Sequence, residues 1–224
     1  MEQNNDTQTY TLAKLQMFDE CPQKYKFCYI DKVHIVEPIT KTKTGNNIHN
    51  IINYYLKGMD VTKLIEALKP NEKRLWFNFK NSDIKNYKYI ASEYAFNLKL
   101  DEYWLVGRID ALFEYDGDYI IIDWKTGSTF TPENVKFQTG FYLLCMYEIL
   151  KIKKLIKHPE QLSLHYYDLA ADSVVKIRLN EDTYLQYKTQ FLSIINKINE
   201  TKNFFCNKTE KCKFCKYYRA CPYY

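Results

Sequence analysis

The chain has 224 residues, 46% of them hydrophobic, which is enough to bury a substantial core in one domain. Its formal net charge of +5 is compatible with a polyanionic partner but is too small to identify one. No apolar run is long enough for a membrane span and no signal peptide is found, so we expect a cytoplasmic protein without disulfides. Residues 1–8 are polar and lack periodicity, which predicts a disordered tail.

Apolar spacing predicts a helical N-terminal third. Helices are expected over 12–30, with an interruption near Pro22, and over 45–58, 61–69 and 71–80. Thr44 can cap the second of these helices, and His49 lies off the centre of its apolar stripe. On its own, such a histidine is more often structural or surface-exposed than a metal ligand.

Three strands are predicted next, over 88–100, 103–115 and 118–125, because these runs are rich in β-branched and aromatic residues. Asp116-Gly117 favours the left-handed backbone angles of a two-residue turn, so residue 115 should pair with 118. Asp110 then lies opposite Asp123. Side chains alternate between faces, which puts Lys125 on the face of Asp123 and Trp124 on the other.

Two opposed carboxylates repel each other, and a divalent cation would remove that conflict. Oxygen ligands suit Mg²⁺ or Mn²⁺, which can polarise a phosphoryl oxygen. Lys125 could orient a water molecule or offset the charge on the phosphate. The alternative is a solvated hairpin with incidental charges, but Ile120, Ile121 and Ile122 indicate a strand buried on both faces, where such charges need a reason.

The second half of the chain completes a mixed α/β pattern. Pro132 suits the first turn of a helix over 133–150, where Gln138 and Tyr142 share one face. These two side chains could hold a phosphate or a base, or pack against the sheet. A hairpin is expected over 161–169 and 173–179, and Asn180 can cap a final helix to about residue 199.

Four of the seven cysteines lie in the tail, in the pattern C-x5-C-x2-C-x5-C. A local zinc site would use Cys206, Cys212, Cys215 and Cys221. An iron-sulfur cluster could instead use the last three with a distant fourth ligand. Cys28 and Cys145 are expected to be buried thiols.

Basic and aromatic residues alternate around the tail cysteines. Lysines and an arginine supply cations for phosphates, and the rings offer surfaces for base stacking; the residues are Lys208, Lys211, Lys213, Lys216, Arg219, Phe214, Tyr217 and Tyr218. A solvated basic face is the alternative.

Two strings near the predicted hairpin resemble the core of the PD-(D/E)XK nuclease superfamily, in its RecB-like branch: Gly107-Arg108-Ile109-Asp110 and Ile121-Ile122-Asp123-Trp124-Lys125-Thr126-Gly127. Gly45-Asn46-Asn47-Ile48-His49 is similar to the upstream helix that carries a metal-binding histidine in that branch. Gln138 and Tyr142 are similar to its Q-x3-Y element. Asp123 stands where many superfamily members have glutamate, although aspartate is common in RecB-like members.

The resemblance implies a restriction-endonuclease-like sheet flanked by helices, in one nuclease domain over 1–224. Within it the helical part is expected at 9–60, the nuclease core at 85–180 and the cysteine tail at 200–224. The implied catalytic residues are Asp110, Asp123 and Lys125. The implied ligands of Mg²⁺ or Mn²⁺ are His49, Asp110, Asp123 and the Trp124 backbone carbonyl. Gln138, Tyr142 and Arg108 are the implied substrate contacts, with Glu93 as a support.

The cysteines extend the resemblance to AddB nuclease domains and CRISPR-adaptation exonucleases, in which one cysteine before the core and three after it hold a 4Fe-4S cluster. Cys21, in Phe18-Asp19-Glu20-Cys21-Pro22, is similar to the upstream ligand, and Cys212, Cys215 and Cys221 are similar to the other three. Cys206 is then spare. Such a cluster would join the N- and C-terminal ends of the domain.

The implied activity is a metal-dependent DNA exonuclease acting on single-stranded DNA or DNA ends in repair, recombination or CRISPR adaptation. No P-loop pattern is present, so the chain is expected to be a standalone nuclease or a subunit that works with a helicase or a CRISPR-adaptation protein. The alternative is a catalytically inactive nuclease-fold subunit with a DNA-binding or scaffold role.

Overall fold

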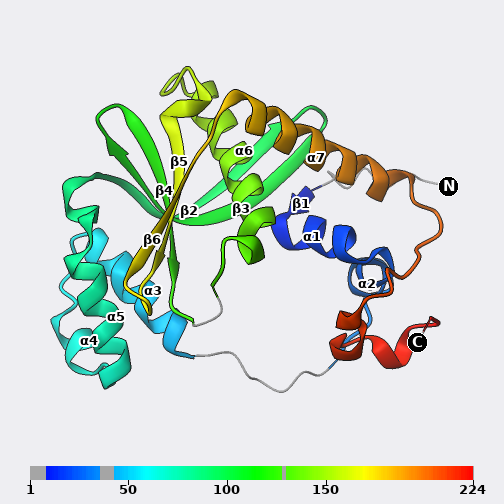
Figure 1. Cartoon of the computed structure of the whole chain (residues 1–224), viewed down its shortest axis with the longest axis horizontal. Coiled ribbons are helices and arrows are strands. Elements are labelled where there is room, and N and C mark those ends of the chain that lie inside the picture. Colours follow the sequence, from blue (N-terminus) through cyan, green and yellow to red (C-terminus); the bar gives the residue numbers. More distant parts are fainter. Residues whose placement is uncertain (1–8, 36–42, 128–129, 224) are drawn as a thin grey trace. The chain divides into compact units, whose positions relative to one another are not determined.

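A computed structural model describes residues 9–35, 43–127 and 130–223 (Figure 1). The expected disordered tail, residues 1–8, lies outside this part of the chain. The chain divides into two compact units. The first contains Met1–Thr40, Lys99–Val106 and Lys188–Tyr224, and the second contains Lys41–Leu98 and Gly107–Tyr187.

A mixed six-stranded sheet confirms the α/β class. Its strands are β1 (Thr9–Thr11), β2 (Lys88–Leu100), β3 (Tyr103–Tyr115), β4 (Asp118–Lys125), β5 (Leu162–Asp168) and β6 (Ser173–Arg178). The order is β1-β3-β4-β5-β6, and β2 also pairs with β3. β4 and β5 run parallel, whereas β3 with β4 and β5 with β6 are antiparallel. The short strand β1, which pairs in parallel with the start of β3, was not predicted.

The hairpin between β3 and β4 has the predicted register. Asp116 and Gly117 adopt positive φ angles of 54° and 82°, as a two-residue turn of this kind requires. The strands pair from Tyr115 with Asp118 to Ala111 with Ile122. Asp110 and Asp123 are the next residues along this register, so the turn sequence alone fixes their juxtaposition.

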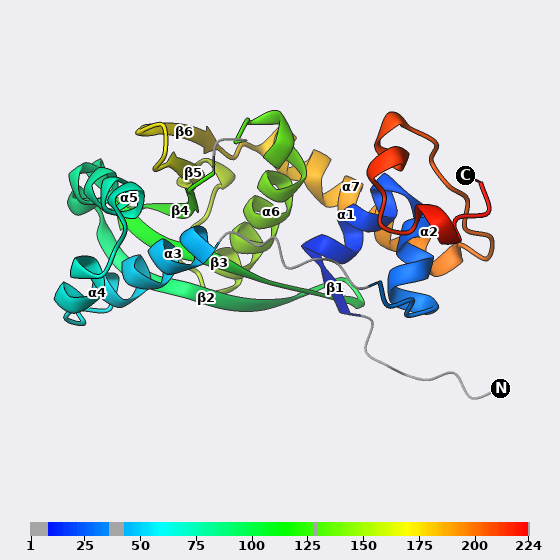
Figure 2. The same cartoon turned by 90° about the horizontal axis from the view of Figure 1, so that it is seen from below.

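Helices cover both faces of the sheet in the second unit. The helices are α3 (Lys43–Leu56), α4 (Thr62–Glu66), α5 (Pro70–Asn81) and α6 (Lys136–Ile152). Ile48, Leu75 and Phe79 from α3 and α5 pack in one core cluster with Ile122 and Trp124. Figure 2 shows α3, α4 and α5 grouped together beside the strands, whereas α6 contacts β5 on the opposite face. Alternation along β4 thus directs Trp124 into the core and leaves Asp123 and Lys125 facing α6.

The first unit joins N- and C-terminal segments. Its helical elements are α1 (Leu12–Glu20), α2 (Pro22–Tyr25), a π-helix (Lys26–Ile30), part of α7 (Glu181–Glu200) and two 3-10 turns (Glu210–Phe214 and Tyr218–Ala220). The predicted break near Pro22 occurs at Cys21, which has an extended backbone between α1 and α2. The Gln23 backbone N–H donates to the Phe205 carbonyl (3.2 Å), and the Asn207 side chain donates to the Glu20 carbonyl (3.1 Å).

Two cysteines outside the tail differ in burial. Cys145 on α6 is fully buried, as predicted, but Cys28 is only half-buried, so the expectation of a second buried thiol is wrong. Cys28 lies in the π-helix, whose wider turn displaces the side chain from ordinary α-helical spacing. In the described part of the chain, no helix has both the length and the apolar character needed to cross a membrane.

Candidate active site

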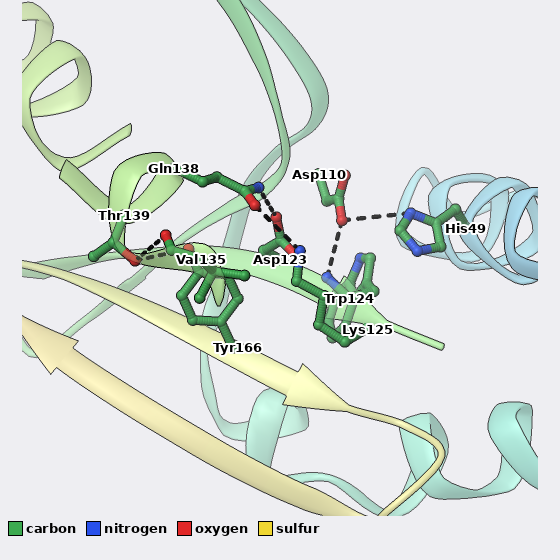
Figure 3. A network of polar contacts seen from close by, with 9 residues as sticks. All are labelled: His49, Asp110, Asp123, Trp124, Lys125, Val135, Gln138, Thr139 and Tyr166. Carbon is green, nitrogen blue, oxygen red and sulfur yellow. Dashed lines mark hydrogen bonds and ion pairs between the residues drawn. The ribbon is translucent and has the colours of Figure 1, made fainter. Parts of the chain in front are cut away.

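Four elements bring polar side chains together at the end of the β3–β4 hairpin. β3 supplies Asp110, β4 supplies Asp123 and Lys125, α3 supplies His49, and α6 supplies Gln138 (Figure 3). These five residues, all singled out by the sequence, point toward one another. Their positions along the chain span 90 residues, so only the fold makes them neighbours.

Asp110 is held by two donors. The backbone N–H of Trp124 donates to Asp110 Oδ2 (2.9 Å), which links the carboxylate directly to the strand that carries Asp123. His49 Nδ1 lies 3.4 Å from the same oxygen. Burial alone would lower the pKa of His49, but the hydrogen bond to Asp110 and the charges of Asp110, Asp123 and Glu93 outweigh it and raise that pKa.

Asp123 is buried, and both of its oxygens have donors. Lys125 Nζ lies 2.7 Å from Oδ1, and Gln138 Nε2 donates to Oδ2 (2.6 Å). Lys125 Nζ also donates to Gln138 Oε1 (3.3 Å), which closes a three-residue network. Burial and the charge of Asp110 raise the pKa of Asp123 to about 6, against the opposing influence of Lys125 and His49. The site therefore resists holding two negative charges in the absence of a further cation.

Tyr166 supports Lys125 from the neighbouring strand, and the sequence did not indicate it. Asp123 pairs with Tyr166 in the parallel register of β4 and β5, and Lys125 Nζ lies 5.2 Å from the centre of the Tyr166 ring. Thr139 gives its single hydroxyl proton to the Val135 carbonyl (2.9 Å), so the Tyr166 hydroxyl donates to Thr139 (2.9 Å). This fully buried ring provides an electron-rich face for the ammonium group.

The remaining predicted site residues lie around this network. Arg108 is well exposed, and its Nε lies 3.0 Å from Glu93 Oε2. Glu93 has a positive φ of 48° inside β2, a strained conformation for a non-glycine residue. Tyr142 is half-buried on α6; burial, followed by the charges of Asp123 and Asp110, raises the pKa of its hydroxyl.

The two carboxylates have the oxygen atoms that a hard cation prefers. In this structure those oxygens contact hydrogen-bond donors of the protein instead. Among the described residues, no three His, Cys, Asp or Glu side chains are positioned as ligands of a common metal ion. Asp110 and Asp123 supply carboxylate oxygens and excess negative charge, which fit Mg²⁺ or Mn²⁺. The backbone N–H of Trp124, rather than its carbonyl, makes the hydrogen bond at this site.

In the first unit, a cavity of about 680 Å³ is lined by five cysteines: Cys21, Cys206, Cys212, Cys215 and Cys221. The two hydrogen bonds that flank position 206 hold it beside the segment of Cys21. Burial and the neighbouring Cys21 and Cys221 thiols raise the pKa of Cys206. Thiolate sulfurs fit zinc or an iron-sulfur cluster. The sequence predicted a different set of four of these cysteines for each kind of centre. In the fold, all five line the same cavity.

Comparisons with known proteins identify the family to which this fold belongs. Residues 9–222 match the family model described as PD-(D/E)XK nuclease superfamily. A crystal structure from Eubacterium rectale, described as a "Putative exonuclease", is similar to this chain with a TM-score of 0.56 and 10% identity, covering 98% of this chain and 93% of that one. The structure of SSO0001 matches with a TM-score of 0.46 and 14% identity, covering 100% and 88% of the two chains. A search of curated proteins finds no match. Because the family model spans nearly the whole sequence, the chain belongs to the PD-(D/E)XK nuclease superfamily.

Proposed function

We propose that the protein is a metal-dependent deoxyribonuclease that hydrolyses phosphodiester bonds at Asp110, Asp123 and Lys125. The main support for this proposal is that two carboxylates, Asp110 and Asp123, lie close together and that Asp123 is buried. Asp123 is 6% exposed, and its pKa is raised by burial and by Asp110. A buried carboxylate pair disfavours its own ionisation, whereas a nuclease uses such a pair to hold a cation.

Lys125 is proposed to act on the attacking water. Its ammonium group lies beside Asp123, contacts Gln138 and faces the Tyr166 ring, so it is held in one place by three neighbours. From there it can hold the water by a hydrogen bond and offset the negative charge that develops on the phosphate. Tyr166 is a positioning residue in this scheme, because it contacts Lys125. Gln138 also contacts Lys125 and remains a proposed substrate contact.

Asp110, Asp123, His49 and the Trp124 backbone carbonyl are the proposed ligands of Mg²⁺ or Mn²⁺. When bound, this cation neutralises the carboxylates and polarises a phosphate oxygen. Gln138 donates to one Asp123 oxygen and Lys125 contacts the other, which leaves a second lone pair on each oxygen for a cation. Arg108 and Tyr142 are proposed to contact the DNA backbone or a base, with Glu93 orienting Arg108 through their ion pair.

Single-stranded DNA or DNA ends are the proposed substrate, cleaved as an exonuclease. The RecB-like motifs support this choice, because AddB nuclease domains and CRISPR-adaptation exonucleases, which they resemble, act on DNA ends. A role in repair, recombination or CRISPR adaptation, in the cytoplasm and with a helicase or CRISPR-adaptation protein as partner, is part of the same proposal.

A thiolate-ligated centre in the five-cysteine cavity completes the proposal. The resemblance supports a 4Fe-4S cluster on Cys21, Cys212, Cys215 and Cys221. Zinc on Cys206, Cys212, Cys215 and Cys221 is the alternative, and the visible absorption of anaerobically purified protein distinguishes them. The 4Fe-4S cluster would link Cys21 to the tail, so its ligation should contribute to folding, whereas zinc would link residues of the tail alone.

The deciding experiment follows end-labelled single-stranded DNA incubated with anaerobically purified protein and Mn²⁺. We expect cleavage by the wild type, none in EDTA, and none by Asp110→Asn. Asp172→Asn is the matched control, since Asp172 is exposed in the turn between β5 and β6 and asparagine tolerates its positive φ. A folded wild type that binds the DNA but leaves it intact would refute the enzyme and favour the scaffold role.

A further inference from the structure

The charge of this chain is concentrated at one end. Residues 201–224 hold six of the 32 basic residues and one of the 27 acidic residues, so their net charge of +5 equals that of the whole chain. Residues 1–200 hold 26 of each sign and are balanced. A thiolate centre would offset part of this charge, but the six cations are Lys202, Lys208, Lys211, Lys213, Lys216 and Arg219, all exposed.

An unusually exposed ring lies among these cations. Phe214 is the last residue of the 3-10 turn Glu210–Phe214. It is 90% exposed, the largest value among the exposed large hydrophobic side chains of the described residues. Phe205 is 62% exposed in the same segment. Tyr217, which the sequence offered as a stacking surface, is instead buried and packs against Phe27. Phe214 is therefore the most exposed ring of this segment among the described residues.

The surroundings of Phe214 favour an anionic polymer. Lys208, Lys211 and Lys213 line the same cavity as Phe214. Lys213 pairs with Glu210 (2.5 Å), the one acidic side chain of this segment, while Lys208 and Lys211 have no carboxylate partner in the described part of the chain. Cations without carboxylate partners that line the same cavity as an exposed aromatic ring combine phosphate attraction with base stacking.

We propose that the tail surface formed by Lys208, Lys211 and Phe214 is a binding site for single-stranded DNA, separate in sequence from the Asp110–Lys125 hairpin. Phe214 stacks on an unpaired base, and Lys208 and Lys211 contact the flanking phosphates. In a duplex the bases are stacked on each other and are not available to a protein ring. An exposed ring can therefore stack on the bases of a single strand but not on those of a double strand. The choice of DNA as the polymer rests on the proposed function.

Binding is measured by fluorescence anisotropy of a labelled oligothymidylate, in EDTA and in the Asp110→Asn background so that no cleavage occurs. Phe214→Ala should weaken binding about tenfold or more, as removal of a stacking ring does elsewhere. Lys208→Gln with Lys211→Gln should reduce the slope of log affinity against log salt by about 1.4, or about 0.7 for each phosphate contact. Both changes are at exposed side chains and should leave the fold and the iron or zinc content unchanged.

Matched controls come from α5, where Phe77 is 64% exposed and Lys73 is exposed as well. Phe77→Ala and Lys73→Gln should leave affinity unchanged. Equal losses from these controls and from the tail variants would overturn a specific tail site. Losses from the lysine variants without a loss from Phe214→Ala would overturn the single-strand assignment and favour a double-stranded or other polyanion.

The two proposals fail separately. A wild type that binds oligothymidylate through Phe214 but does not cleave DNA with Mn²⁺ would refute the nuclease and leave the tail site intact. Cleavage that depends on Asp110, together with full oligothymidylate binding by Phe214→Ala, would refute the tail site and leave the nuclease.

Discussion

Replacing Asp123 with asparagine should stabilise the metal-free protein at neutral pH while abolishing cleavage. The folded protein raises the pKa of Asp123 from 3.8 to about 6, so folding disfavours the ionised carboxylate. A group whose pKa is raised on folding contributes stability at low pH, and this stability is lost as pH rises from about 4 to about 6. Asparagine cannot ionise and avoids the loss.

The size of the effect follows from the shift. About two pKa units at ~1.4 kcal/mol each give about 3 kcal/mol as the cost of ionising Asp123 in the folded state. That value already includes the attraction of Lys125, which asparagine keeps only in part. We therefore expect the free energy of unfolding of Asp123→Asn to exceed that of the wild type by about 1–3 kcal/mol above pH 7, and by nothing near pH 4.

Urea unfolding of both proteins at several pH values, after the same metal removal, measures this difference. Comparison at each pH is essential because His165 acts in the opposite direction. Burial lowers the pKa of His165 to about 4, so its contribution to stability is complete above about pH 6.5 and declines as pH falls toward 4. The difference between variant and wild type cancels this common contribution.

Asp172→Asn is the matched control, because its side chain is exposed. Adding Mn²⁺ should stabilise the wild type, by about 2.7 kcal/mol at 100 times the dissociation constant, and should not stabilise Asp123→Asn. If Asp123→Asn is no more stable than the wild type above pH 7, or if the gap does not widen with pH, the strained carboxylate pair is refuted.

Three further outcomes can be measured. Tyr166→Phe should keep most of the cleavage rate, because the ring still faces Lys125. Tyr166→Leu should lower kcat at least tenfold with little change in KM. Equal rates for the two variants, with unchanged circular dichroism, would contradict the positioning role. Gly107→Ala should lower the urea midpoint, because the new Cβ would lie 2.6 Å from Cζ of the buried Phe96 ring. His165→Gln should flatten the loss of stability between pH 6.5 and 4, and an unchanged acid profile would show that His165 is not the group responsible.

Local sequence signals predicted much of the architecture. Asp116-Gly117 gave the turn and hence the register that brings Asp110 to Asp123, because a two-residue turn leaves little choice of pairing. The break at Pro22 and the final helix after Asn180 were also visible from local chemistry, and both are confirmed. The helix expected over 133–150 begins instead with a 3-10 turn, Glu133–Val135, and α6 ends at Ile152.

What the sequence could not supply depends on contacts distant along the chain. The role of Tyr166 beside Lys125 follows from the parallel register of β4 and β5, which no local turn determines. β1 has only three residues and is a strand because it pairs with β3. Gln138 was identified, but its bond to Asp123 depends on how α6 crosses the sheet. Cys206 was set aside as spare because the resemblance already assigned four cluster ligands, and its place beside Cys21, 185 residues earlier, follows only from the fold.

The five-cysteine cavity has a consequence for mutational work. A tetrahedral ion or a four-iron cluster takes four thiolates, so the cavity contains one more than either centre needs. The proposed centre would then tolerate the loss of one ligand, because a reserve thiol remains in the same cavity. Single cysteine substitutions should then retain part of the metal, and a ligand is identified with certainty only when Cys206 is replaced together with it.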